Sequence, residues 1–184
     1  MKKMTFLAAS VLALSSIAQA QSKGKILIAY FSWGGNTREV AKQIQQQAGG
    51  DLFEIATVKT YPADYDDCVA EAKQEQQADA RPPLAAEVKD MAAYDAVFVG
   101  YPNWWGTMPM ALFTFLEKYD LGGKSVIPFC THGGGRLGRS VNDLQKLCPN
   151  ATLLEGLAVS SNMSKRSKDD VAQWLQKIGM INGK

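Results

Sequence analysis

The sequence KILIAYFSWGGNTREVAKQI, from Lys25 to Ile44, decides the fold of this chain. It begins with an apolar, β-branched run at residues 26–31, whose length is typical of a buried strand. The run breaks at SWGGNT, residues 32–37, which is rich in glycine and hydrogen-bonding side chains. Apolar residues at helical spacing then follow on one face. The stretch therefore predicts a strand, a glycine-rich turn and a helix in succession.

The predicted turn suits an anionic group such as a phosphate. Glycines let the backbone approach a ligand closely, and the first N–H groups of a helix have no intrahelical partner. These groups point, with the positive end of the helix dipole, at an anion bound there. Ser32 and Thr37 add hydroxyl groups and Asn36 adds an amide. An ordinary strand-to-helix turn is the alternative, since these residue types are common in turns.

Two further loops of unusual composition follow predicted strands. The loop at residues 102–109 contains adjacent tryptophans, Trp104 and Trp105, and exposed rings of this size usually mark a binding surface for a flat ligand. Packing of both rings on the core is the alternative. The loop at residues 132–138 begins with a lone histidine, His132, and three glycines, which indicate close approach of a flat or anionic group. With no second histidine we expect no metal site.

The first 20 residues are predicted to be a secretory signal peptide. Lys2 and Lys3 precede an apolar run that is too short for a membrane span, and Ala18-Gln19-Ala20 matches a cleavage site. A retained anchor is the alternative. Cleavage after Ala20 leaves one domain, residues 21–184, exported to a bacterial periplasm and without a stable membrane anchor.

The charge and the cysteines narrow the function classes. The chain carries a formal net charge of +2, and both excess lysines lie in the predicted signal peptide, so the remainder is near neutral. This balance argues against a nucleic-acid partner. Cys68, Cys130 and Cys148 are far apart, which excludes a C-x-x-C motif. We expect three buried free thiols, with one disulfide as the alternative.

Strands and helices are predicted to alternate along the whole chain. This alternation indicates a doubly wound α/β domain, in which a parallel sheet is covered by helices on both faces. The three unusual loops all follow the carboxyl ends of strands, where ligands bind in such sheets. Tyr61 and Tyr65 could also line a ligand site, although packing of a loop on a helix is the more frequent explanation for such residues. The predicted strands span residues 26–31, 51–58, 95–101, 124–131 and 151–159, and the last helix contains residues 171–178 with Ser167 as its N-cap.

This chain resembles the flavodoxins, which bind flavin mononucleotide (FMN). The phosphate loop of that family has an aromatic residue before the turn, a serine or threonine at its start, glycine and threonine within it, and alanine and an aliphatic residue in the helix. The sequence Asn103-Trp104-Trp105-Gly106 is similar to the second loop of one branch of the family. The residues that match the phosphate-loop pattern are Tyr30, Ser32, Gly35, Thr37, Ala41 and Ile44.

The resemblance implies a short-chain, flavodoxin-like fold, with a five-stranded parallel sheet of order 2-1-3-4-5 in three α/β/α layers. It implies non-covalent FMN and no catalytic side chain. The expected function is electron transfer with a redox partner protein or a small-molecule oxidant. An FMN-dependent reductase of quinones or nitro compounds is one alternative, and a non-redox binding domain is another. The implied cofactor-binding residues are Ser32, Trp33, Gly34, Gly35, Asn36, Thr37, Tyr101, Pro102, Asn103, Trp104, Trp105, Gly106, Thr131, His132, Gly133 and Gly134.

Overall fold

Parallel strand pairing organises the part of the chain that the computed structural model describes, residues 24–182. The predicted signal peptide, residues 1–20, lies outside the described residues. The strands are β1 (Ile26–Tyr30), β2 (Asp51–Glu54), β3 (Ala96–Pro102), β4 (Ser125–His132), β5 (Thr152–Leu153) and β6 (Leu157–Ser160). The helices are α1 (Asn36–Ala48), α2 (Tyr65–Gln77), α3 (Met110–Lys118), α4 (Ser140–Leu147) and α5 (Lys168–Lys177), with 3-10 helices η1 (Met91–Ala93) and η2 (Ser161–Arg166).

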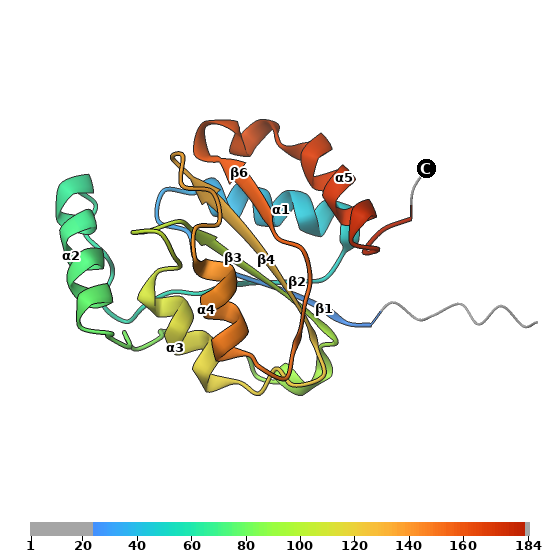
Figure 1. The fold of residues 1–184 in the computed structure, drawn as a ribbon, viewed down its shortest axis with the longest axis horizontal. Helices are drawn as coiled ribbons and strands as arrows, with labels where there is room; N and C mark the ends of the chain where they lie inside the picture. Colours follow the sequence, from blue (N-terminus) through green and yellow to red (C-terminus); the bar gives the residue numbers. More distant parts are fainter. Residues whose placement is uncertain (1–23, 183–184) are drawn as a thin grey trace, which may run out of the picture.

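The sheet has the order β2-β1-β3-β4-β5, which confirms the predicted order and the doubly wound fold. Its two faces carry separate apolar cores because successive residues of a strand point to opposite faces. In β1, Leu27 and Ala29 belong to the core that includes α3 and Leu144 of α4. Ile26 and Ile28 belong to the core that includes residues of α1 and α5. Figure 1 shows these two helical layers on either side of the sheet.

The edge strand was predicted as one continuous strand over residues 151–159. The structure instead divides it into β5 and β6, which both pair with β4. Between these pairings the edge segment contains one more residue than β4 does. The carbonyl of Val126 accepts from the N–H of Leu154 (2.9 Å), so alternate residues of β4 face this edge. Pro128 is the next residue of β4 that faces this edge. Since proline has no N–H to donate, the ladder is interrupted opposite it.

The second predicted strand, residues 51–58, is also longer than the observed β2. The chain leaves the sheet after Ile55, whose N–H donates to the carbonyl of Tyr30 (2.7 Å). Residues 56–58 instead pair with residues 83–85 in the antiparallel sense, through hydrogen bonds of 2.8 and 2.9 Å. This pairing holds the connection after α2 against the first part of the chain.

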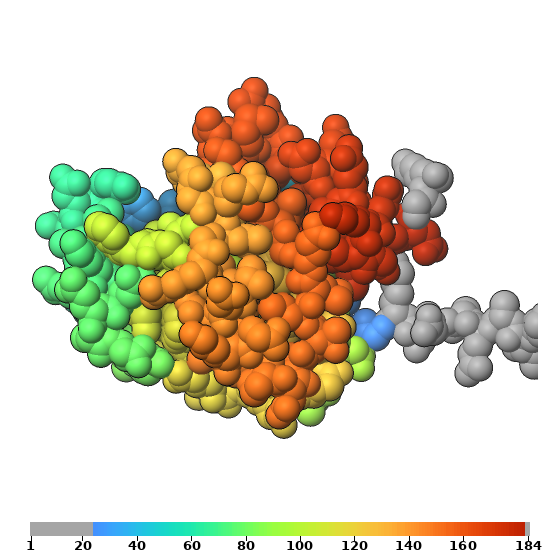
Figure 2. Space-filling view, in the orientation of Figure 1, coloured from blue at the N-terminus to red at the C-terminus, as the bar shows by residue number. Residues whose placement is uncertain are grey.

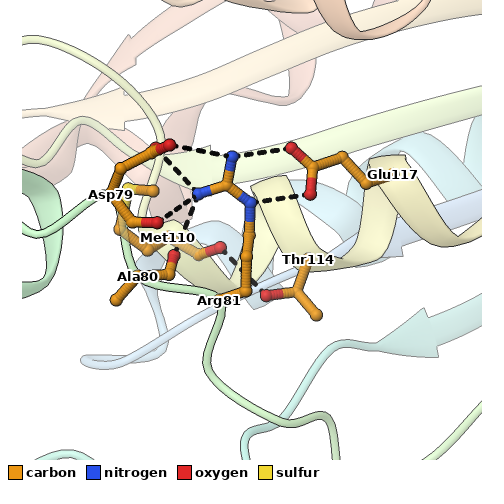
Figure 3. Close-up of polar contacts among 6 residues, drawn as sticks. All are labelled: Asp79, Ala80, Arg81, Met110, Thr114 and Glu117. Carbon is orange, nitrogen blue, oxygen red and sulfur yellow. Dashed lines mark hydrogen bonds and ion pairs between the residues drawn. The ribbon is translucent and has the colours of Figure 1, made fainter.

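Helix α2 lies apart from the two helical layers, as Figures 1 and 2 show at the left of the molecule. Only Cys68 and Ala72 of this helix are buried, so most of its surface faces solvent. The segment that follows is held by Arg81, whose guanidinium donates to both carboxylate oxygens of Glu117 in α3 (2.7 Å each) and to Asp79 (2.8 Å; Figure 3). These hydrogen bonds raise the pKa of Arg81 and anchor the end of α2.

The segment η2 is held on α1 by a buried polar cluster. The side-chain amide of Gln43 donates to the carbonyl of Ser164 (2.7 Å), and the Ser167 hydroxyl donates to Gln43 Oε1 (2.9 Å). Ser167 lies at the N-cap position of α5, but its hydroxyl makes no capping hydrogen bond. The predicted N-cap position of Ser167 is therefore confirmed, but its hydroxyl is used by this cluster instead of capping the helix. Ser164 Oγ also donates to Asn36 Oδ1 (2.9 Å), at the start of α1.

The three cysteines are buried free thiols, as predicted. Burial raises the pKa of Cys68 and Cys148 to about 11 and that of Cys130 to about 12. The thiols are therefore protonated at neutral pH, and none has the lowered pKa of a reactive cysteine. Within residues 24–182, no helix is long and apolar enough to cross a membrane.

Candidate functional site

A cleft of about 280 Å³ lies where the three unusual loops meet. β1, β3 and β4 are neighbours in the sheet and run parallel, so the loops after their carboxyl ends converge at one edge. Most residues of the predicted cofactor site line the cleft, together with Tyr65 and Ser161. The predicted residues that line it are Ser32, Trp33, Gly34, Asn36, Thr37, Pro102, Asn103, Trp104, Thr131, His132 and Gly133.

The first loop presents unpaired backbone donors to the cleft. The N–H groups of residues 34–37 donate to no group in the described part of the chain. Gly35 has a φ of 85°, a left-handed conformation that glycine adopts without strain, and it forms the N-cap of α1. Ser32 Oγ accepts from the N–H of Arg38 (3.2 Å), which leaves its hydroxyl proton free. A Cβ added to Gly34 would meet no atom within 4 Å, so the backbone is open to a ligand there.

A buried hydroxyl pair joins the first loop to the third. Thr37 Oγ1 lies 2.9 Å from Thr131 Oγ1, and both side chains are almost fully buried. One hydroxyl donates to the other, so the second keeps a proton that can be donated to a ligand. Thr37 therefore positions the two loops as well as offering a donor.

Asn103 holds the second loop against the third. Its side-chain amide donates to the carbonyl of Arg136 (2.6 Å), and its Oδ1 accepts from the N–H of Gly106 (3.0 Å). Its own N–H donates to the carbonyl of Thr131 (2.8 Å). A second connection runs from the N–H of Arg139 to the carbonyl of Gly106 (2.8 Å). Asn103 and Gly106 thus fix the width of the cleft between these loops.

The two adjacent tryptophans lie in different environments. Trp104 is half-buried and contacts Phe31 and Tyr61 edge-on, with ring centroids 5.4 and 5.2 Å apart. Trp105 is 47% exposed, and its indole N–H donates to the carbonyl of Val69 in α2 (3.1 Å). The alternative in which both rings pack on the core is therefore wrong, because Trp105 is exposed. Trp104 lines the cleft, whereas Trp105 packs over α2.

Five residues of the predicted cofactor site do not line the cleft. The side chain of Tyr101 is fully buried in the core, where its hydroxyl pairs with Ser140 Oγ (2.7 Å), so only its backbone is left for contact with a ligand. Sequence reasoning missed Ser161, since the polar segment after β6 carries no pattern that distinguishes this residue. Sequence reasoning favoured a packing role for Tyr65, but this residue lines the cleft with its ring tilted against Trp33. The five residues outside the lining are Gly35, Tyr101, Trp105, Gly106 and Gly134.

No side chain that lines the cleft carries a formal charge at neutral pH. The guanidinium of Arg38, next to the first loop, is paired with Glu54 in β2 (Nε to Oε2, 3.0 Å). His132 accepts a hydrogen bond at Nδ1 from the N–H of Gly134 (2.9 Å). Partial burial and the positive charge of Arg136 both lower the pKa of His132. His132 therefore presents a neutral imidazole with its proton on Nε2, a donor without charge.

The titration of His132 can be followed directly, because it is the only histidine of the chain. We expect the imidazole signals in an NMR pH titration of untagged protein to report a pKa below the ordinary value of about 6.5. Replacing Arg136 by glutamine removes a charge that disfavours imidazolium, so the pKa should move up. A wild-type pKa at or above the ordinary value would contradict this environment.

Within residues 24–182 no group of three or more histidine, cysteine, aspartate or glutamate side chains could hold a metal ion. The donors around the cleft are instead backbone N–H groups, hydroxyls, an amide and a neutral imidazole. Such a set binds an anion through hydrogen bonds, assisted by the dipole of α1.

The chain matches known proteins over most of its length. The family model described as flavodoxin matches residues 25–178. The crystal structure of a candidate flavoprotein from Bacteroides eggerthii is 33% identical, with 84% of this chain and 98% of that protein covered and a TM-score of 0.75. A flavoprotein from Lactobacillus acidophilus, crystallised in complex with FMN, is 23% identical (81% and 99% covered, TM-score 0.62), which shows a shared fold.

One similar protein has a named activity. An NAD(P)H dehydrogenase (quinone) from Cupriavidus metallidurans is 32% identical over 97 residues. The matched segment is 51% of this chain and 46% of that protein, so less than half of the dehydrogenase is represented.

Proposed function

Because this chain belongs to the flavodoxin family, we propose that it binds FMN non-covalently and transfers electrons through it. The observation that carries the proposal is the cleft itself. An anion-binding loop with free N–H groups at residues 34–37 and an aromatic wall at Trp104 line the same uncharged cleft. A ligand with a phosphate at one end and a flat ring system at the other matches this division.

The first loop fits a phosphate dianion. Its donors are neutral, so the negative charge is balanced by hydrogen bonds and the dipole of α1. Ser32 and Asn36 both line the cleft, and the Ser32 hydroxyl still has its proton to donate. The Asn36 side chain is oriented by Ser164, whose hydroxyl donates to its Oδ1 (2.9 Å). The residues that would hold the phosphate are therefore positioned before any ligand binds.

The second and third loops fit the ring system. A Cβ added to Gly133 would meet no atom within 4 Å, so bare backbone faces open space on the third-loop side. Trp104 and Pro102 line the second-loop side. FMN supplies the redox chemistry when bound, while the chain determines its position and its exposure to water. His132 adds a neutral Nε2–H donor, which can hydrogen-bond an electron-rich ring atom without adding charge.

The direct test is a titration of the protein with FMN, followed by the visible spectrum, with riboflavin as the matched ligand control. Riboflavin lacks only the phosphate, so we expect its Kd to be at least a hundredfold higher. Equal affinities for the two flavins would contradict the phosphate assignment. Stepwise anaerobic reduction then separates two roles. Two distinct one-electron steps support a carrier between proteins, and a single two-electron step supports a reductase.

A second candidate function is an FMN-dependent reductase of quinones or nitro compounds. The similarity to the quinone dehydrogenase over 97 residues favours it. The discriminating measurement is steady-state turnover of the FMN-loaded protein with NADH or NADPH and a quinone. Negligible turnover together with rapid oxidation by a redox protein supports the carrier.

We also propose that the protein acts outside the cytoplasm. The N-terminal pattern at residues 1–20 supports export to a bacterial periplasm, where the partner is a redox protein or a small-molecule oxidant. N-terminal sequencing of the exported form should then begin at Gln21, and a chain that keeps Met1 would contradict export by cleavage.

A further inference from the structure

A second pocket, of about 260 Å³, adjoins the cofactor cleft on the side of α2. Four residues that do not line the cleft contribute to it: Cys68, Val69 and Ala72 of α2, and Trp105 of the second loop. The pocket and the cleft share one wall. Four residues, from the first loop, the second loop and α2, line both of them. The shared residues are Trp33, Tyr65, Asn103 and Trp104.

The lining of this second pocket is aromatic and uncharged. Four aromatic rings contribute to it, which is unusual for a surface that packs only against its own chain. Few free polar groups remain on its lining residues, because the indole N–H groups of Trp33 and Trp105 donate to the carbonyls of Pro62 and Val69. Burial and the nearby carboxylates of Glu71 and Glu75 keep the Cys68 thiol protonated by raising its pKa. A charged ligand would find no compensating charge in this lining, whereas a neutral flat ring would find several faces and edges to contact.

The outer wall of the pocket is built at a cost in backbone strain. Trp105 has a φ of 51°, a conformation that bulky residues rarely adopt. Such strain persists only where surrounding contacts impose it. Here the indole N–H donates to the carbonyl of Val69 (3.1 Å), and the Lys73 ammonium lies 4.8 Å from the ring centroid. Arg81, just after α2, is anchored to Glu117 of α3 (Figure 3).

The pocket and the adjoining cleft have similar volumes, about 260 and 280 Å³, so the lining of the pocket rather than its size selects the ligand. Its place beside the cofactor cleft relates it to electron transfer, because a ring bound here shares the wall made by Trp104 with a ligand of the cleft.

We propose that this pocket binds the electron acceptor, and that the acceptor is a small, planar, neutral aromatic molecule of the quinone class. The inference rests on the proposed function, since the electrons come from reduced FMN. A quinone bound here takes up two electrons and two protons from the two-electron-reduced flavin, leaves as the hydroquinone, and returns the flavin to its oxidised form.

The test uses 1,4-naphthoquinone as the probe and isothermal titration calorimetry on both FMN-loaded and FMN-free protein. Ala72→Phe fills the pocket from α2, and Ala72 does not line the cofactor cleft. The matched control is Ala70→Phe, at an exposed position of the same helix that lines neither hollow. We expect Ala72→Phe to raise the Kd for naphthoquinone at least tenfold, and Ala70→Phe to leave it within twofold. The Kd for FMN should stay within twofold in both variants.

A second variant protects the test against misfolding. Ala72 is buried, whereas Val69 is only half-buried, so Val69→Phe narrows the same pocket with less disturbance of packing. Equal naphthoquinone affinity in wild type, Ala72→Phe and Val69→Phe would overturn the proposal. So would a fall in FMN affinity in the two folded variants, because the pocket would then belong to the cofactor site.

The proposal and the proposed function fail in different ways. If the wild-type protein binds no FMN, the function is wrong, but the naphthoquinone titration of the FMN-free protein still tests the pocket. If FMN binds and naphthoquinone does not, only the acceptor pocket is wrong. A charged analogue, 1,4-naphthoquinone-2-sulfonate, should bind at least tenfold more weakly than the neutral probe.

Discussion

Replacing Ser32 and Thr37 by alanine together is expected to raise the Kd for FMN at least a hundredfold. Both hydroxyls line the cleft next to the unpaired N–H groups of residues 34–37. A hydrogen bond to a charged group is worth roughly 1.5–3 kcal/mol, so the loss of two corresponds to about 3–6 kcal/mol. Since about 1.4 kcal/mol is tenfold in Kd, the lower limit already exceeds a hundredfold. Quenching of FMN fluorescence on binding measures the change.

The controls for this double variant separate lost donors from lost structure. Thr37 is buried against Thr131, so its removal also leaves the Thr131 hydroxyl unpaired, and the melting temperature of the FMN-free protein must be compared. The matched variant Ser32→Thr with Thr37→Ser keeps both hydroxyls and should bind FMN within about a factor of five. Riboflavin, which has no phosphate, should bind the alanine variant and the wild type almost equally. An unchanged Kd for FMN would disprove the phosphate-loop assignment.

The local elements of this fold could be predicted because they depend on nearby residues. The strand, turn and helix at residues 25–44 are encoded by a buried apolar run, a glycine-rich break and helical spacing. The convergence of the three loops then follows from topology alone, since parallel strands place their carboxyl ends at one edge. The main part of the candidate site could therefore be predicted from the sequence alone.

The errors arise where distant parts of the chain compete for the same residues. Residues 56–58 look like the continuation of a strand, but they pair with residues 83–85, which no local pattern announces. The hydroxyl of Ser167 has the usual position of a helix cap and is taken by Gln43, far away in sequence. The break between β5 and β6 was easier to predict than these two features, because Pro128 in the adjacent strand is visible in the sequence.

The positions of the site residues also depend partly on local sequence and partly on contacts between distant parts of the chain. Tyr101 ends a buried run, and its place in the core follows from the pairing of β3 on both sides by β1 and β4. Its prediction as a cofactor-binding residue follows from the resemblance to the flavodoxins and concerns the backbone at the start of the second loop. Trp105 lies beside Trp104 in sequence but packs over α2, and Ser161 reaches the cleft from the opposite end of the chain. Only the tertiary structure brings these two residues to their positions.

Replacing Gly100 by valine is expected to destabilise the fold by about 3 kcal/mol, the upper end of the usual cost of overpacking a core. Gly100 lies in β3, and a Cβ added there would clash with Cζ of Phe129. Phe129 is itself fully buried in β4, so its ring has no free space to enter. For a chain of this length, the loss corresponds to a fall in melting temperature of about 6–12 °C.

The cause of this destabilisation can be isolated with a double-mutant cycle. Phe129→Leu removes the ring atoms that a side chain at Gly100 would meet, so Gly100→Val should cost at least about 1 kcal/mol less in that background. Urea unfolding of the four proteins gives the coupling energy. The substitution should also disturb the cofactor cleft. The carbonyl of Gly100 accepts from the N–H of Phe31 (2.9 Å), which lies directly before the first loop. FMN affinity should therefore fall in Gly100→Val and partly recover in the double variant. An equal cost of Gly100→Val in both backgrounds would show that the Phe129 ring is not the obstacle.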